Sequence, residues 1–289
     1  MAFTLKIDVD KLDAIDVHVH PNLPPPGYTG EATPGQRGGN APPSAIKFMT
    51  YDETAAYYRE RKMAFCIFGN DSTPQHPGGG IQTLMEAAER NSDVLIPFAW
   101  TDPKRGKDAV EDTKRFIDMG IKGFKFHPPG GGYFPNDEAF YPLYKVIEAA
   151  GLPALFHTGQ TAVGAGRPGG GGIKLKYGNP MYLDDVAADF PNLSIIMAHP
   201  SVPWQDEALS VAVHKPKVYI DLSGWSPKYF PQELVHYGNT LIKGKVLFGS
   251  DFPMITPDRW MADLPAANFR DEVKPLIFKE NAARLLGLR

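Results

Sequence analysis

The stretch Ile15-Asp16-Val17-His18-Val19-His20 places two histidines two positions apart in an otherwise apolar run. In a β-strand, residues two apart point to the same side, so His18 and His20 converge on one point with Asp16 one step below them. The apolar members then face the opposite, buried side: Ile15, Val17 and Val19. Two imidazoles directed at one spot form half of a metal site. Because such a pair can also be a solvated strand end, its meaning depends on the rest of the chain.

Other apolar runs end in the same way. A histidine or an aspartate closes four of them: His127 after 123–126, His157 after 153–156, His199 after 195–198 and Asp251 after 246–250. The remaining histidines, His76, His214 and His236, fall on predicted loops or helices, and we assign them no function. This placement predicts one shared site at the ends of several strands.

The chain alternates strand-like and helix-like segments. Apolar runs typical of strands buried on both faces cover residues 14–20, 63–69, 94–100, 121–127, 153–157, 193–199, 218–222 and 246–251. Segments with helical spacing cover residues 51–62, 81–91, 108–119, 137–150, 181–190, 204–214, 231–237 and 271–286. Eight such units indicate an α/β fold, a single (β/α)8 TIM barrel over residues 1–289. The competing fold is an open doubly wound sheet, which usually carries a glycine-rich phosphate loop after its first strand. This chain has His-Pro-Asn there.

The longest irregular stretches directly follow strands, at 21–48, 128–135 and 158–180, and all are rich in glycine and proline. In a barrel, loops after strands lie over the catalytic face, so we expect these long loops to cover the site. Plain chain flexibility is an equally good explanation of their glycines. No Gly-Lys-Ser/Thr sequence follows them, which excludes a Walker loop.

Composition restricts the partners. With 30 basic and 33 acidic residues the net charge is −3, and no basic stretch stands out, so neither nucleic acid nor an anionic membrane surface is an expected partner. The single cysteine, Cys66, lies in an apolar run and is expected to be a buried, inert thiol. The start of the chain lacks the apolar core of a signal peptide, and no run is long enough to span a bilayer. We therefore expect a cytoplasmic protein.

The ordered set of motifs resembles the amidohydrolase superfamily. The motifs are the His-x-His of the first strand, Phe156-His157-Thr158-Gly159, Ala198-His199-Pro200 and Gly249-Ser250-Asp251-Phe252-Pro253. They look most like the branch that includes aminocarboxymuconate semialdehyde decarboxylase and related metal-dependent hydrolases, and the match covers nearly the whole chain. Barrels of this branch are often dimers or larger, so the resemblance implies a homo-oligomer.

The resemblance also implies roles. His18, His20, His157 and Asp251 would hold one divalent metal, most often zinc, although manganese and iron also suit three imidazoles and a carboxylate. His199 would act on a bound water or on the substrate as a base or orienting group, and Asp251 could also accept the proton of that water. Taken alone, His199 can be a core histidine, and Asp251 can be a helix N-cap.

Four further residues are candidate substrate contacts. By strand alternation Lys125 points into the barrel; in some amidohydrolases such a lysine is carboxylated and bridges two metals, but the branch resembled here binds one. We therefore expect Lys125 to bind an anion or support the ligands, with a lysine paired to an acid inside the barrel as the alternative. His127 is expected to bind substrate or a second metal. Trp204 and Trp225 could wall a planar substrate, and helix packing explains them nearly as well.

Three functions compete. The leading hypothesis is a hydrolase whose metal-bound hydroxide attacks a carbonyl of a small aromatic or β-keto ester, thioester, lactone or amide. The alternative is a nonoxidative decarboxylase, a carboxy-lyase in which His199 or Asp251 delivers a proton to carbon. A third is a catalytically silent barrel acting as a binding subunit, against which the complete ligand set argues. Arg37 and Arg167 lie in the expected covering loops, where an arginine could grip a carboxylate.

Overall fold

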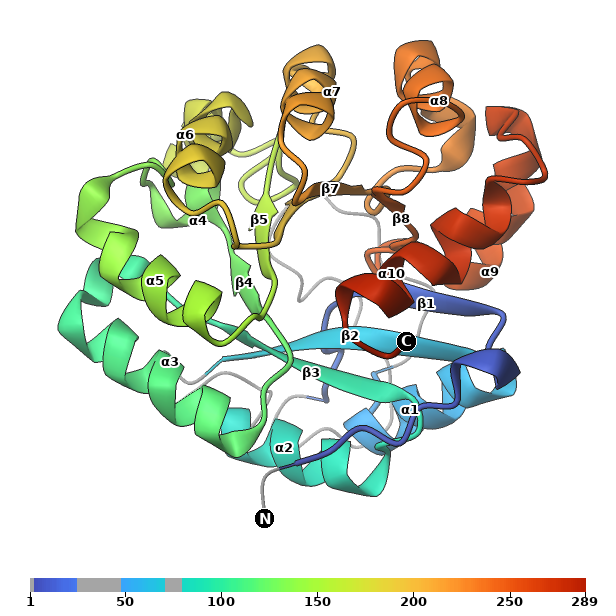
Figure 1. The fold of residues 1–289 in the computed structure, drawn as a ribbon, viewed down its shortest axis with the longest axis horizontal. Helices are drawn as coiled ribbons and strands as arrows, with labels where there is room; N and C mark the ends of the chain where they lie inside the picture. The colour runs from blue at the N-terminus through green and yellow to red at the C-terminus, as the bar shows by residue number, and fades with distance from the viewer. Residues whose placement is uncertain (1–2, 25–47, 71–79) are drawn as a thin grey trace.

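The computed structural model describes residues 3–24, 48–70 and 80–289. Within these ranges, eight parallel strands form one sheet in sequence order, and the helices surround it (Figure 1). The strands are β1 (Ala14–Val19), β2 (Met63–Asn70), β3 (Leu95–Trp100), β4 (Phe124–Phe126), β5 (Ala154–His157), β6 (Ile195–Ala198), β7 (Val218–Asp221) and β8 (Val246–Leu247). A doubly wound sheet would reverse its order partway, so this order confirms the (β/α)8 barrel and excludes the alternative.

The helices form the outer layer. In the described ranges they are α1 (Tyr51–Glu60), α2 (Gly80–Arg90), α3 (Lys107–Met119), α4 (Pro128–Gly131), α5 (Tyr141–Ala149), α6 (Met181–Asp189), α7 (Gln205–His214), α8 (Gln232–Gly238), α9 (Pro257–Asp263) and α10 (Asn281–Leu285). The sequence prediction missed α4, which lies within the expected loop 128–135, and α9. Both begin with proline in the first turn, which a helix tolerates there, and neither has the long apolar spacing that identifies a helix from sequence.

The barrel is almost closed by backbone contacts between β1 and the segment after β8. The strand predicted over 246–251 has only two residues with regular pairing, Val246–Leu247. Beyond them the chain continues alongside β1: the Val17 N–H donates to the Phe248 carbonyl at 3.0 Å, and the Asp251 N–H donates to the His18 carbonyl at 3.0 Å. This seam brings Asp251 next to the His-x-His pair.

Strand β1 carries a β-bulge. Its register against β2 pairs Asp16 with Phe65 and Val19 with Ile67, so three steps along β1 match two along β2. An extra residue in one strand interrupts the alternation of side chains between the two faces of a sheet. The pattern read from the sequence therefore does not hold through this stretch.

Because of the bulge, the side chains of β1 do not point to the faces that the sequence pattern predicts. Ile15 and Val17 pack in the apolar interior of the barrel and not on the face opposite His18. Asp16 points outward to α1, where its Oδ2 accepts a hydrogen bond from the Tyr58 hydroxyl at 2.7 Å. The prediction that Asp16 lies below the two histidines on their face is wrong, because regular alternation was assumed across the bulge.

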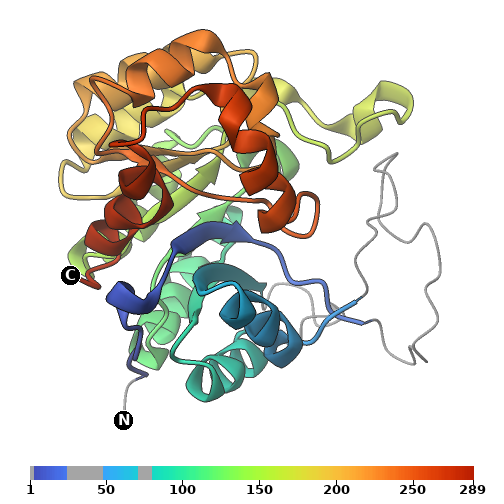
Figure 2. The ribbon, with the colours of Figure 1, turned by 90° about the vertical axis from the view of Figure 1, so that its right-hand side faces the viewer.

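One further expectation, the burial of Cys66, is confirmed. Cys66 is fully buried, as predicted, and burial raises the pKa of its thiol well above the usual value. None of the described helices has the length and apolar character needed to cross a membrane. Both chain ends lie on one side of the barrel, and the segment around 160–178, yellow-green in Figure 2, projects on the opposite side. That side is where the strands end and where the site is expected.

Candidate metal centre

His18 stands at the centre of the site. Its ring is fully buried, and its Nδ1 lies 2.9 Å from Oδ2 of Asp221 and 2.9 Å from Oγ of Ser223. A carboxylate oxygen only accepts, so the neutral ring carries its hydrogen on Nδ1 and leaves the lone pair on Nε2. Burial, followed by the charge of Lys125, lowers the pKa of His18 to about 3, which keeps the ring neutral and able to bind a metal.

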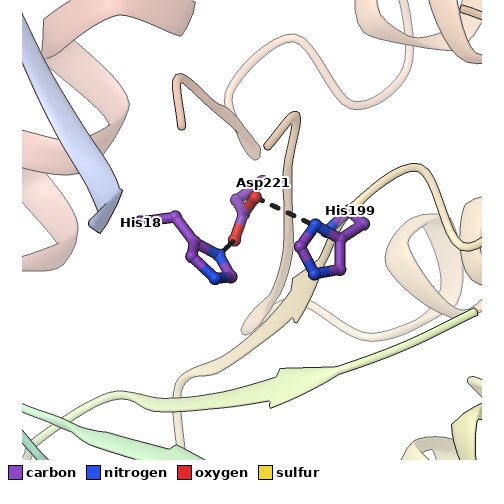
Figure 3. A group of neighbouring side chains, drawn as sticks. All are labelled: His18, His199 and Asp221. Carbon is purple, nitrogen blue, oxygen red and sulfur yellow. Dashed lines mark hydrogen bonds and ion pairs between the residues drawn. The ribbon is translucent and has the colours of Figure 1, made fainter. Parts of the chain in front are cut away.

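Asp221 and Ser223 are the site residues that sequence reasoning missed. Figure 3 shows the Asp221 carboxylate between His18 and His199. The Ser223 N–H donates to Asp221 Oδ1 at 2.8 Å, and Ser223 Oγ lies 2.9 Å from Nδ1 of His199. The next residue is Gly224. A side chain would not fit there, because a Cβ atom would stand 2.7 Å from Nδ1 of His199. One feature of the sequence could have identified Asp221. It is a charged residue in the apolar run 218–222, where it is expected to be buried, and a buried charge needs a partner.

His20 and Asp251 form the open side of the site. Nε2 of His20 lies 3.1 Å from Oδ1 of Asp251, and Nε2 of His18 lies 3.5 Å from the same oxygen. Asp251 has a φ of +65°, a left-handed conformation uncommon outside glycine and often found at functional sites. Burial alone would raise the pKa of Asp251, but the hydrogen bond with His20 holds it below its usual range. One ligand atom from each of the three residues therefore lies within 4.8 Å of the others.

Asp16 joins the two segments that carry these ligands. Its Oδ1 accepts from the His18 N–H at 3.1 Å and from the Ser250 N–H at 3.0 Å, and its Oδ2 accepts from the Ser250 hydroxyl at 2.5 Å. These bonds tie β1 to the turn after β8, directly beside His18 and Asp251. They fix the relative position of the ligands from behind.

His157 and His199 form a second, adjoining pair. Two groups of the described residues have ligand atoms within 4.8 Å of one another: His18, His20 and Asp251, and His18, His199 and Asp221. His157 belongs to neither group, and its Nδ1 lies 3.0 Å from Nε2 of His199. The outer nitrogens face carbonyl oxygens, with His199 Nδ1 3.0 Å from the Ser223 oxygen and His157 Nε2 3.1 Å from the Gln160 oxygen. Carbonyl oxygens only accept, so neutral rings keep their hydrogens on these outer atoms. The lone pairs of the two inner nitrogens then face each other.

Lys125 lies beneath the site inside the barrel. It is 1% exposed, its ammonium stands 4.9 Å from the centre of the Phe68 ring, and its Nζ lies 3.0 Å from Nε2 of His18. Burial lowers the pKa of Lys125 to about 8, while the charges of Asp221 and Asp251 act in the opposite direction. A charged Lys125 donates to the atom that a metal would use, so the two compete for His18.

The other predicted substrate contacts are placed differently. Nδ1 of His127 accepts from the Gly130 N–H at 2.9 Å and thereby caps α4, and its ring stacks on His157 at 4.2 Å. Among the described residues that line the cavity beside His157 and His199, neither Lys125 nor Trp204 occurs, whereas Trp225 does. The Trp204 backbone N–H instead donates to Ser201 as the chain enters α7.

A cavity of about 850 Å³ opens above the site. It is lined by His157, His199 and Asp251, by residues of the 158–180 loop and by residues that follow β7 and β8. The expectation that the loop after β5 covers the site agrees with this lining. Residues 25–47 of the first expected loop, including Arg37, and His76 lie outside the described residues.

The donor set fits a divalent cation. The imidazoles of His18 and His20 and the carboxylate of Asp251 converge, and the hydrogen on Nδ1 of His18 is fixed by Asp221, as it is in carboxylate–histidine–metal arrangements. Because imidazole nitrogens and a carboxylate oxygen suit several metals, the geometry does not choose among zinc, manganese and iron.

Comparison with known proteins identifies the family. The family model described as amidohydrolase matches residues 15–288, so the chain belongs to the amidohydrolases, a family whose members bind a divalent metal. Among curated proteins, fluG of Emericella nidulans is 27% identical over 165 residues. That match spans 49% of this chain and only 18% of fluG.

Solved structures share the fold at low identity. A probable 2-pyrone-4,6-dicarboxylic acid hydrolase from Acinetobacter baumannii, with citric acid bound, has a TM-score of 0.65 at 17% identity and covers 96% of this chain and 100% of that one. 2,6-Dihydroxybenzoate decarboxylase from Rhizobium has a TM-score of 0.67 at 14% identity, covering 95% and 98%. A dihydroxybenzoic acid decarboxylase from Polaromonas sp. JS666 with bound manganese has a TM-score of 0.61 at 13% identity, covering 84% and 87%. These likenesses show that the chain shares the barrel fold of these structures, and the family match places it among the amidohydrolases.

Proposed function

We propose that this enzyme hydrolyses a small carbonyl compound, with His18, His20, His157 and Asp251 holding one divalent metal and His199 serving as the base. The observation that carries the proposal is the orientation of His199. Its Nδ1 faces the Ser223 carbonyl oxygen at 3.0 Å, so the neutral ring presents an unprotonated Nε2 beside His157 and the cavity. A base with its lone pair directed at the site suits the activation of water.

The protonation state of His199 agrees with this role. Burial lowers its pKa below the usual value, so the ring is neutral near pH 7 and can accept a proton. A bound divalent metal would polarise the substrate carbonyl and lower the pKa of water in the site to roughly 7. His199 Nε2 takes the proton of the attacking water and returns it to the oxygen, nitrogen or sulfur that leaves when its bond to the carbonyl carbon breaks.

His157 is the least direct member of the proposed ligand set. Its Nε2 is oriented by the Gln160 carbonyl, which leaves Nδ1 as the atom available to a metal. That atom adjoins His199, and the proposed base therefore lies next to the ligands. On the other side of the proposed ligand set, the hydrogen bond from His18 to Asp221 orients the ring of His18.

The second candidate is a decarboxylase, which the names of two structural neighbours favour. Carbon protonation requires an acid in the resting enzyme, and a neutral His199 with its hydrogen on Nδ1 has none to give from Nε2. The name of another structural neighbour, the probable 2-pyrone-4,6-dicarboxylic acid hydrolase, favours hydrolysis. We therefore place hydrolysis first.

Isotope labelling separates the two reactions. The metal-loaded enzyme is screened with aromatic esters, lactones, β-keto thioesters and hydroxybenzoates, and each substrate that turns over is repeated in H₂¹⁸O and in D₂O. Hydrolysis places ¹⁸O in the acid product. Release of CO₂ with deuterium on carbon, and no ¹⁸O in the acid, would establish the decarboxylase instead.

A further inference from the structure

The main cavity has a buried floor and an exposed mouth. His157 and His199, at its floor, are 6% and 7% exposed. Four large apolar side chains that line the same cavity are between 42% and 64% exposed, namely Val163, Leu175, Tyr229 and Met254. The exposed fraction of the lining side chains therefore increases from the proposed reacting groups at the floor to an apolar rim at the mouth.

Arg259 belongs to that rim. It lies in the first turn of α9, lines the cavity, and has a side chain that is 66% exposed. Among the described residues that line the cavity it is the only arginine or lysine. The cavity thus combines an apolar wall, which includes Trp225, with a single cationic group at its mouth.

The guanidinium of Arg259 is loosely held. Its Nε lies 3.8 Å from Oδ2 of Asp263, which is longer than a hydrogen bond, and exposed pairs of this kind contribute little. Asp263 is engaged elsewhere, because it accepts a hydrogen bond from the Ser226 hydroxyl at 2.6 Å. The planar fork of Arg259 can therefore bind a carboxylate in two parallel hydrogen bonds.

We propose that Arg259 selects substrates that carry a carboxylate at the end remote from the reacting carbonyl, with a flat apolar body between the two. This inference rests on the proposed function in taking the cavity as the substrate site. The apolar side chains of the rim favour an apolar body, and the depth of the histidines directs the reacting end inward. Two other cations do not compete for this role: Lys125 is buried beneath His18, and Arg167 is not among the lining residues.

A matched pair of ligands tests the inference without turnover. 4-Acetylbenzoate and 4-acetylbenzamide have the same shape and an unhydrolysable ketone, and they differ in charge at the remote end. Their dissociation constants are measured by calorimetry on the metal-loaded full chain, in low and in high salt. Wild type is expected to prefer the carboxylate by about fivefold, as an exposed ion pair allows, and to lose the preference as salt screens the charge.

Variants assign the preference to the residue. Arg259→Met should abolish it while leaving 4-acetylbenzamide binding unchanged, and Arg259→Lys should retain part of it, because the charge remains without the fork. Arg167→Met is the matched control and should behave as wild type. Equal binding of the two ligands by wild type, or an undiminished preference in Arg259→Met, would overturn the inference.

A parallel pair of esters separates this inference from the proposed function. The esters are 4-(methoxycarbonyl)benzoate and methyl 4-carbamoylbenzoate, assayed for ¹⁸O incorporation. Binding that discriminates by charge through Arg259, with neither ester hydrolysed, would uphold the anion site and count against hydrolysis. Hydrolysis of both esters at equal kcat/KM, with no difference in Arg259→Met, would uphold hydrolysis and refute the role of Arg259.

Discussion

Nδ1 of His18 lies 2.9 Å from Oδ2 of Asp221, although the two residues are 203 positions apart in the sequence. Both groups are fully buried. The contact decides which nitrogen of His18 is available to a metal, and it depends on β1 and β7 ending at the same edge of the barrel.

Asp221→Asn should weaken metal binding about 10- to 100-fold, because the carboxylate that orients His18 and raises its basicity is lost. Competition with a chelator of known affinity measures the change. Asp271→Asn, at a position 95% exposed, is the control and should bind metal as wild type does. An unaltered affinity in a correctly folded Asp221→Asn would show that the contact does not tune the site.

One tight divalent metal per chain is expected, held by His18, His20, His157 and Asp251. Elemental analysis of His18→Ala, His157→Ala and Asp251→Ala should show loss of that metal together with loss of activity. His214→Ala, on the exposed side of α7, should keep both. Full activity of metal-free wild type would end this interpretation.

Lys125→Met should strengthen metal binding by on the order of tenfold, because it removes a positive charge that lies 3.0 Å from Nε2 of His18. Metal content should stay at one per chain. A carboxylated Lys125 would behave in the opposite way, with two metals in wild type and fewer in the variant, and elemental analysis distinguishes the cases.

His199→Asn should lower kcat by about 10²- to 10⁴-fold, the usual contribution of one positioned acid–base group. The metal should remain bound, since the residue is assigned to proton transfer and not to ligation. Steady-state kinetics with parallel metal analysis checks both parts. Loss of the metal in this variant would instead make His199 a ligand.

The metal-free protein should lose stability in acid. Burial lowers the pKa of His18 and of His127 to about 3, compared with about 6.5 in an unfolded chain. The folded state therefore binds fewer protons than the unfolded state between these values, and stability present above pH 6.5 is lost as the pH falls toward 3. Each such histidine contributes up to about 1.4 kcal/mol per pH unit.

Urea unfolding of the chelated protein at several pH values measures this slope. His127→Gln should make it shallower by up to one proton, whereas His236→Gln, at an exposed position, should leave it unchanged. Equal slopes in wild type and His127→Gln would mean that His127 is protonated equally in the folded and unfolded states.

The sequence by itself determined the barrel and the strand ends that carry the chemistry. Apolar runs alternating with helical segments require parallel strands covered on both faces, and His18, His20 and Asp251 follow from where those runs stop. These features are local, because the periodicity of apolar side chains and the positions where strands end can be read from neighbouring residues. The missed α4 and α9 mark the limit of that approach, since prolines and short length concealed them.

Only the tertiary structure decided which groups meet. The bulge in β1 turned Asp16 toward Tyr58 and kept Ile15 and Val17 in the barrel, because strand pairing with β2 sets the register. Asp221 became a partner of His18, and Arg259 came to line the cavity, because closure of the barrel brings the ends of β1, β7 and β8 together. Hydrogen bonds between residues some 200 positions apart have no counterpart in local sequence pattern, so they exist only once the barrel has closed.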